Sequence, residues 1–109
     1  MLKDNSHMST ALLDPQRPAI AELCRRFGVA RLDLFGSATT DAFHPGASDF
    51  DFLVELDPLA SGSRAQRLID LAEALESLLG AHVDLVNPHY IHNPYFSAEV
   101  ARTRVPIYA

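Results

Sequence analysis

Residues 48–56, Ser-Asp-Phe-Asp-Phe-Leu-Val-Glu-Leu, alternate in character and predict a β-strand from about residue 49 to 56. Because successive side chains of a strand point to opposite faces, Asp49 and Asp51 share one face while the phenylalanines enter a core on the other. Two neighbouring carboxylates repel each other, and burying either one unpaired is costly. The pair therefore favours a bound cation. Oxygen ligands with no histidine or cysteine nearby indicate a hard ion, Mg²⁺ above all.

The size and charge of the chain limit what it can be. Its 109 residues predict one domain with a single modest core, and 48% hydrophobic with 21% charged residues is typical of a globular protein. No apolar run is long enough to span a membrane. The net charge of −5 argues against a general nucleic-acid binder, which needs a basic surface, so no direct nucleic-acid binding is expected.

Two further features concern the location and the limits of the domain. Cys24 is the only cysteine, so no internal disulfide can form, which fits a cytoplasmic protein. Residues 1–7 are polar and patternless, and we interpret them as a remnant of an expression vector. The domain is then expected to occupy residues 8–109.

Hydrophobic spacing and helix-breaking residues predict helices alternating with strands. The first helix begins at Asp14-Pro15, with Asp14 as N-cap, and ends at Gly28. The other helices are expected at residues 64–79 and 95–103. The strands are expected at residues 31–35, 49–56, 82–86 and 105–108. This order predicts an α/β (α+β) domain with a small mixed β-sheet flanked by helices.

Asp84 is a single acid in an otherwise apolar strand, between Val83 and Leu85. If this strand lies beside the strand of Asp49 and Asp51 with Asp84 on the same face, three carboxylates converge. Three carboxylates are the minimum protein contribution to a two-magnesium site for phosphoryl transfer. Asp49 and Asp51 would bridge the ions, and Asp84 would hold the ion that activates an attacking hydroxyl and would accept its proton.

Gly36-Ser37 follows the predicted strand 31–35. A glycine there lets the backbone approach a phosphate group, and Ser37 can add a backbone N–H and a hydroxyl. The pair carries little information alone, but it is far more specific when Asp-x-Asp and a third strand aspartate follow it.

Together these motifs resemble the minimal nucleotidyltransferases (MNT) of the DNA polymerase β superfamily, and more narrowly the antitoxin of HEPN–MNT toxin–antitoxin pairs. The family pattern is Gly-Ser, a spacer, Ser-Asp-x-Asp, and a strand with a third Asp. Six residues carry it here: Gly36, Ser37, Ser48, Asp49, Asp51 and Asp84. The resemblance implies a polymerase β-type fold, two Mg²⁺ ions held by the aspartates, and nucleotide binding by Gly36, Ser37 and Ser48. By position alone, Ser48 also fits a turn or capping residue.

The resemblance also implies an activity, namely transfer of AMP from ATP to a tyrosine of a cognate HEPN ribonuclease toxin, which blocks the toxin. Two departures leave alternatives open: the spacer of eleven residues is one longer than usual, and Thr40-Asp41 stand where the family tends to have Arg-Gly. One alternative is an antitoxin that neutralises its toxin by binding. The other is a subunit of a small-molecule nucleotidyltransferase of the antibiotic-modifying type.

The remaining notable residues are expected to have structural roles. Cys24 is predicted in the core, and Arg64 and Arg67 on a solvated helix face. His44 is expected in a solvated loop, and His89 and His92 are interpreted as surface or packing histidines. The tyrosines are expected to be packing residues: Tyr90, Tyr95 and Tyr108.

Overall fold

The computed structural model describes residues 13–39 and 49–109, which form a four-stranded sheet in the order β3-β2-β1-β4. The strands are β1 (Val29–Phe35), β2 (Phe50–Leu56), β3 (Val83–Val86) and β4 (Val105–Tyr108). β2 runs parallel to β3 and antiparallel to β1, and β4 runs antiparallel to β1. The sheet is therefore mixed, as predicted, with the strand after the last helix at one edge.

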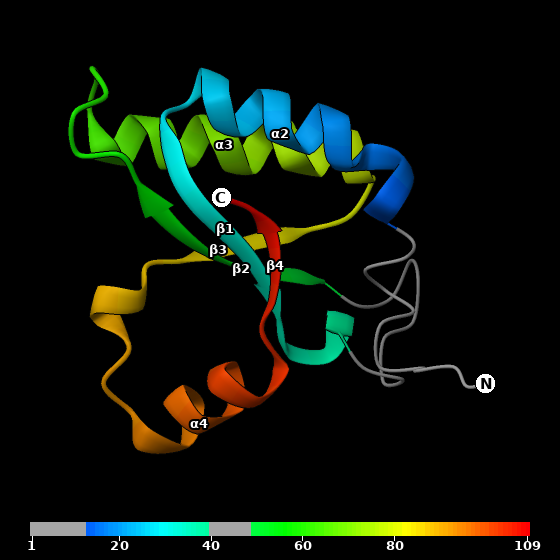
Figure 1. Ribbon diagram of the computed structural model, residues 1–109, viewed down its shortest axis with the longest axis vertical. Coiled ribbons are helices and arrows are strands. Elements are labelled where there is room, and N and C mark those ends of the chain that lie inside the picture. The colour runs from blue at the N-terminus through cyan, green and yellow to red at the C-terminus, as the bar shows by residue number, and fades with distance from the viewer. Residues whose placement is uncertain (1–12, 40–48) are drawn as a thin grey trace.

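Helices cover the two faces of the sheet unequally. Figure 1 shows α2 (Arg17–Arg26) and α3 (Arg64–Leu79) side by side over one face, whereas α4 (Pro94–Thr103) lies apart from them on the other side. The main core lies beneath α2 and α3, where the apolar residues of β1 and β2 meet both helices. Its fully buried members include Ile20, Cys24, Leu32, Leu34, Phe52, Leu71 and Leu75. The predicted core position of Cys24 is confirmed, and burial raises the pKa of its thiol to about 12.

The ends of the helices follow local sequence signals to different degrees. α3 has the predicted bounds: Ser63 accepts a hydrogen bond from the Gln66 N–H, and Gly80 adopts the left-handed φ of 67° that ends the helix. The prediction that Asp14 caps the first helix is wrong. Asp14 lies in a preceding 3₁₀ turn and accepts a hydrogen bond from Arg17 Nε at 2.9 Å, so its carboxylate does not reach the backbone of α2.

The prediction of a solvated Arg67 is also wrong, although Arg64 is exposed as expected. Arg67 is only 8% exposed, because its Nη1 donates to the carbonyl oxygens of Phe27, Gly28 and Asp57. These carbonyls belong to the end of α2 and to the loop after β2. Its guanidinium therefore links α3 to the end of α2 and to the loop after β2. No local sequence pattern predicts these contacts.

Two of the tyrosines differ from expectation as well. Tyr90, in the 3₁₀ turn Pro88–Tyr90, is 77% exposed. Tyr95 is 87% exposed, because α4 packs through Val100 and Thr103 and leaves its first turn in solvent. Tyr108 is partly buried against the main core, as predicted. His89 and His92 are exposed, which agrees with the surface interpretation. His44 lies outside the described residues.

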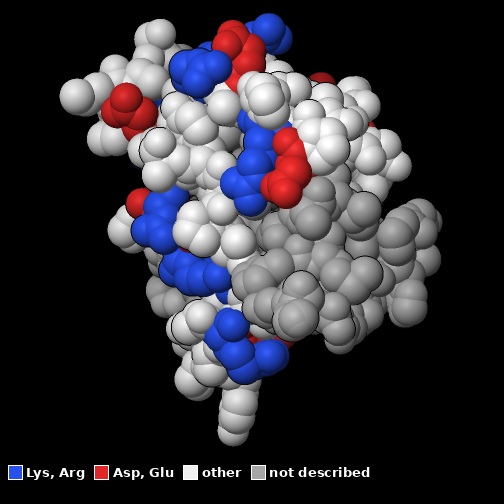
Figure 2. Space-filling model, turned by 45° about the vertical axis from the view of Figure 1, so that its right-hand side comes forward, with Lys and Arg blue, Asp and Glu red and all other residues white. Residues whose placement is uncertain are grey.

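The described surface carries its charges in small groups. Figure 2 shows arginines of one face in separate groups, some with an acidic side chain beside them. Local ion pairs such as Arg17–Asp14, Arg25–Glu22 and Arg102–Glu99 are of this kind. Within the two described ranges, no helix is both long and apolar enough to cross a membrane.

Candidate active site

The pairing of β2 with β3 brings the predicted acids together. Asp51 lies directly opposite Asp84 in the parallel register, so both side chains share the face of the sheet away from α2 and α3. Asp49 precedes β2 by one residue and is exposed. The condition set for Asp84, a neighbouring strand and the same face, is therefore met.

The Gly36 turn lies against Asp51. Gly36 follows β1 with a left-handed φ of 76°, and a Cβ at this position would lie 3.1 Å from Asp51 Oδ2. The Gly36 N–H donates to Thr103 Oγ1 at 2.8 Å, so the last residue of α4 holds this turn in place. Ser37 follows in the 3₁₀ turn Gly36–Thr39, whereas Ser48, Thr40 and Asp41 lie outside the described residues.

The acids are crowded, and their chemistry fits a divalent cation. Burial raises the pKa of Asp51, and the nearby charges of Asp84 and Asp49 and a hydrogen bond with Asp84 raise it further. A positive ion among these carboxylates would relieve both the repulsion and the loss of solvation. Oxygen donors from carboxylates are also the ligands that Mg²⁺ prefers. Asp49, Asp51 and Asp84 are therefore suited to hold metal.

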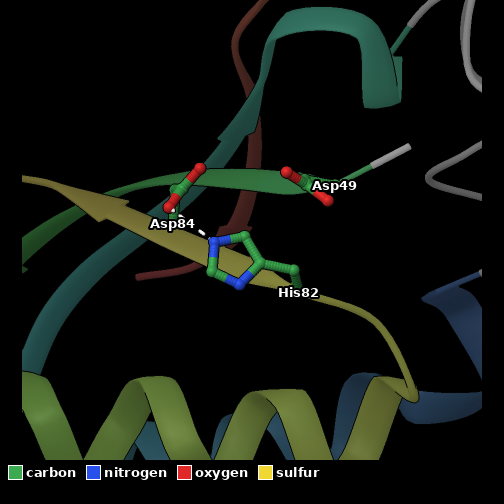
Figure 3. Close-up of side chains that lie close together, drawn as sticks. All are labelled: Asp49, His82 and Asp84. Atoms are coloured by element: carbon green, nitrogen blue, oxygen red, sulfur yellow. Dashed lines mark hydrogen bonds and ion pairs between the residues drawn. The ribbon is translucent and has the colours of Figure 1, made fainter. Parts of the chain in front are cut away.

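His82 is the residue that sequence reasoning missed, and the premise that no histidine lies nearby was wrong. Its Nε2 lies 3.0 Å from Asp84 Oδ1, and its Nδ1 lies 3.0 Å from Glu76 Oε2 of α3. The hydrogen bond to Asp84 raises the pKa of His82 above its ordinary value. Figure 3 shows the imidazole directed at Asp84, with Asp49 beside them. The sequence contained a signal for this contact. In the predicted strand 82–86, residues 82 and 84 have the same parity, so their side chains lie on the same face.

Asp33 is a further acid on the face of Asp51 and Asp84, and the sequence analysis did not single it out. It is 0% exposed and accepts hydrogen bonds from Arg104 Nε at 2.9 Å and Arg104 Nη2 at 2.6 Å. Arg31 Nη2 lies 3.1 Å from the same carboxylate. Asp33 is therefore neutralised within the protein, and it links β1 to the residue that follows α4.

Comparison with known proteins decides the family. A family model described as "Nucleotidyltransferase domain" matches residues 17–106. The chain belongs to this family. This membership and the mixed sheet with its helices confirm the predicted family and fold class.

Individual relatives agree with that assignment. A Methanocaldococcus jannaschii protein named "Putative protein adenylyltransferase MJ1379" is 36% identical over 75 residues, which are 69% of this chain and 73% of the relative. A solved structure titled "Structure of putative minimal nucleotidyltransferase" has a TM-score of 0.69 at 33% identity, covering 93% of this chain and 98% of that one. A crystal structure of a toxin–antitoxin with AMP-PNP has a TM-score of 0.62 at 25% identity, covering 84% and 71% of the two chains. The protein is thus an enzyme of the nucleotidyltransferase class.

Proposed function

We propose that this nucleotidyltransferase is an antitoxin that transfers AMP from ATP to a tyrosine hydroxyl of a cognate HEPN ribonuclease toxin. The observation that carries the proposal is the Asp51–Asp84 pair across β2 and β3, with the Gly36 turn against Asp51. This arrangement joins a phosphate-binding turn to a carboxylate site, which are the two parts that nucleotidyl transfer needs.

Each predicted site residue has a role in this reaction. Asp49, Asp51 and Asp84 would hold two Mg²⁺ ions, and Gly36, Ser37 and Ser48 would contact the triphosphate. When bound, such ions neutralise phosphate charge and lower the pKa of the attacking hydroxyl. Because Gly36 gives its own N–H to Thr103, its part is to allow the close approach, and donors to phosphate would come from the residues after it.

The transfer forms one bond at the α-phosphorus of ATP and breaks another. The tyrosine oxygen forms a bond to the α-phosphorus of ATP while the bond from that phosphorus to the oxygen bridging to the β-phosphate breaks. Pyrophosphate leaves with the bonding electrons, and the Asp84 carboxylate accepts the tyrosine proton. The products are AMP-tyrosine and pyrophosphate.

The exposure of the site favours a protein as the acceptor. The Asp84 side chain is 53% exposed and Asp49 is exposed, so a tyrosine on another protein can reach both. A small-molecule acceptor needs an enclosing pocket to hold it, and the open position of these acids argues against that alternative. The adenylyltransferase name of the relative and the toxin–antitoxin neighbour with AMP-PNP support the same choice.

Co-expression tests the proposal. The chain is produced with the product of its neighbouring gene, and the intact mass of that partner is measured. We expect a mass raised by whole AMP units, lost with the Asp49→Asn, Asp51→Asn double variant and kept with Asp70→Asn, an acid of α3 outside the site. An unmodified partner held in a stable complex would refute the enzymatic account and leave an antitoxin that acts by binding.

A further inference from the structure

The side chains of Asp49, His82 and Asp84 form a mixed nitrogen and oxygen cluster at one end of the sheet. Among the described residues, each offers one ligand atom, and these atoms all lie within 4.8 Å of one another. Two ligands of one ion with bonds of about 2.0–2.2 Å can be at most about 4.4 Å apart, so small side-chain rotations bring all three into range. Figure 3 shows the three side chains facing a common space.

The surroundings of His82 resemble those of a metal-binding histidine. Such a histidine almost always donates its other ring N–H to a carboxylate or a carbonyl group. Here Nδ1 lies 3.0 Å from Glu76 Oε2, and the Val83 N–H donates to the same oxygen at 3.1 Å. Glu76 is therefore held by the backbone of β3 and can accept a hydrogen bond from Nδ1–H, so Nε2 is the ring nitrogen available to a metal ion.

The contact between His82 Nε2 and Asp84 Oδ1 is 3.0 Å long, and a metal ion that binds both atoms would replace the proton of this hydrogen bond. Asp51, which forms a hydrogen bond with Asp84, lies against the Gly36 turn.

We propose that His82, with Asp49 and Asp84, is a ligand of one cation of the site and gives that position a preference for first-row transition ions over Mg²⁺. The inference rests on the proposed function for its metal site but adds a residue and a metal class to it. Imidazole nitrogen suits the later first-row transition ions such as Co²⁺, whereas Mg²⁺ favours oxygen donors and Mn²⁺ lies between the two. Manganese and cobalt ions are the probes that test the assignment.

The test uses the purified full chain without nucleotide or partner. Electron spin-echo measurements on bound Mn²⁺ detect a directly coordinated nitrogen, and titrations give the affinities for Mn²⁺, Co²⁺ and Mg²⁺. We expect a nitrogen coupling in the wild type that His82→Gln abolishes. We also expect His82→Gln to weaken Co²⁺ binding by about 10–100-fold and Mn²⁺ binding by less, while Mg²⁺ binding changes little.

Two variants serve as controls. His89→Gln removes an exposed histidine outside the cluster and is expected to change nothing. Glu76→Gln is expected to keep the nitrogen coupling but to weaken Mn²⁺ binding, because the imidazole loses its orienting carboxylate. Absence of nitrogen coupling in the wild type would overturn the inference. So would an equal loss of Mg²⁺ and Co²⁺ affinity in His82→Gln, which would make His82 a residue that only positions Asp84.

The outcomes separate this inference from the proposed function. AMP transfer to the partner together with metal bound by oxygen alone would refute the role of His82 only. A nitrogen-coordinated ion in a chain that modifies no partner would refute the proposed function only.

Discussion

Asp33 and Asp51 lie on the same face of the sheet, two pairing positions apart, in opposite electrostatic surroundings. Asp33 is opposite Leu53 in the register of β1 with β2, and Phe35 is opposite Asp51. Asp33 is fully buried but has two arginine partners, Arg31 and Arg104. Asp51 is half-buried, and the charges that raise its pKa come from two further carboxylates.

The difference separates structural from functional acids. The charge of Asp33 is balanced by arginines of the fold, and its role is to hold β1 to the segment after α4. The charges of the crowded carboxylates around Asp51 are not balanced within the protein, and their mutual repulsion makes them a site for an external cation. Four predictions test this contrast, from the largest expected effect to the smallest.

Removing the main partner of Asp33 should have the largest effect. Arg104→Met leaves a buried carboxylate with Arg31 alone and is expected to lower the free energy of unfolding by about 3 kcal/mol, the low end for a broken buried pair. Urea denaturation measures this. Arg102→Met, which breaks only an exposed pair with Glu99, should cost less than about 1 kcal/mol. Equal losses in the two variants would contradict the assigned role of Asp33.

Gly36→Ala tests whether the turn and Asp51 form one unit. A left-handed φ costs a non-glycine residue about 1–2 kcal/mol, and the new Cβ would also press on Asp51 Oδ2. Gly80→Ala is the matched control, because its φ is also left-handed but nothing lies within 4 Å of the added atom. We expect Gly36→Ala to be the less stable of the two and the only one to impair AMP transfer; impaired transfer in both would argue against a specific contact.

Divalent cations should stabilise the acidic site. At a metal concentration ten times the dissociation constant, the stabilisation is about 1.4 kcal/mol. A rise in Tm on adding Mg²⁺ or Mn²⁺, reversed by EDTA, is the expected measurement. The Asp49→Asn, Asp51→Asn variant should show no rise, and a rise of the same size in that variant would place the ion elsewhere.

Asp51→Asn should have the smallest effect, and one of opposite sign. The pKa of Asp51 in the folded protein is raised above its ordinary value of 3.8. Without metal, the wild type therefore loses stability as the pH rises from 3.8 through this raised pKa. The variant lacks this loss and is expected to be more stable at pH 7 by less than about 1 kcal/mol, because water screens a half-buried group.

The control for this prediction is the other aspartate of the comparison. Asp33→Asn removes the negative charge and one of the two acceptor oxygens that face the arginines, and it should be destabilising at neutral pH, by about 1–3 kcal/mol. Chemical denaturation of both variants between pH 3 and 7 in EDTA gives the signs. A destabilising Asp51→Asn would show that the acids are already balanced within the protein.

Much of the fold and most of the described site could be predicted because their signals are local. The stripe of α3 with Ser63 before it and Gly80 after it determines that helix, and the alternation around Asp49 and Asp51 determines the strand and its two faces. The prediction for Asp14 failed because several helix starts compete within a few residues. Ser48 lies outside the described residues, so its nucleotide-binding role stays a prediction.

Partners distant in sequence explain why the burial of Arg67 was not predicted. The end of α2 and the loop after β2 present three carbonyl oxygens to it, and spacing along the chain does not identify them. His82 is a different case, because it lies two residues before Asp84 and the shared parity of the two positions was available in the sequence.

Asp33 and Asp84 show what each level of structure decides. In the sequence both are single acids of short strands, Asp33 with Arg31 two residues before it, and the alternation of each strand determines the face on which each lies. The tertiary structure completes the difference, because it brings Arg104 to Asp33 and two further aspartates near Asp84. The sequence by itself determined which residues can carry charge on this face. The packing of the strands and α4 decided which charge is balanced internally, because electrostatic free energy depends on distances between atoms that the chain order does not contain.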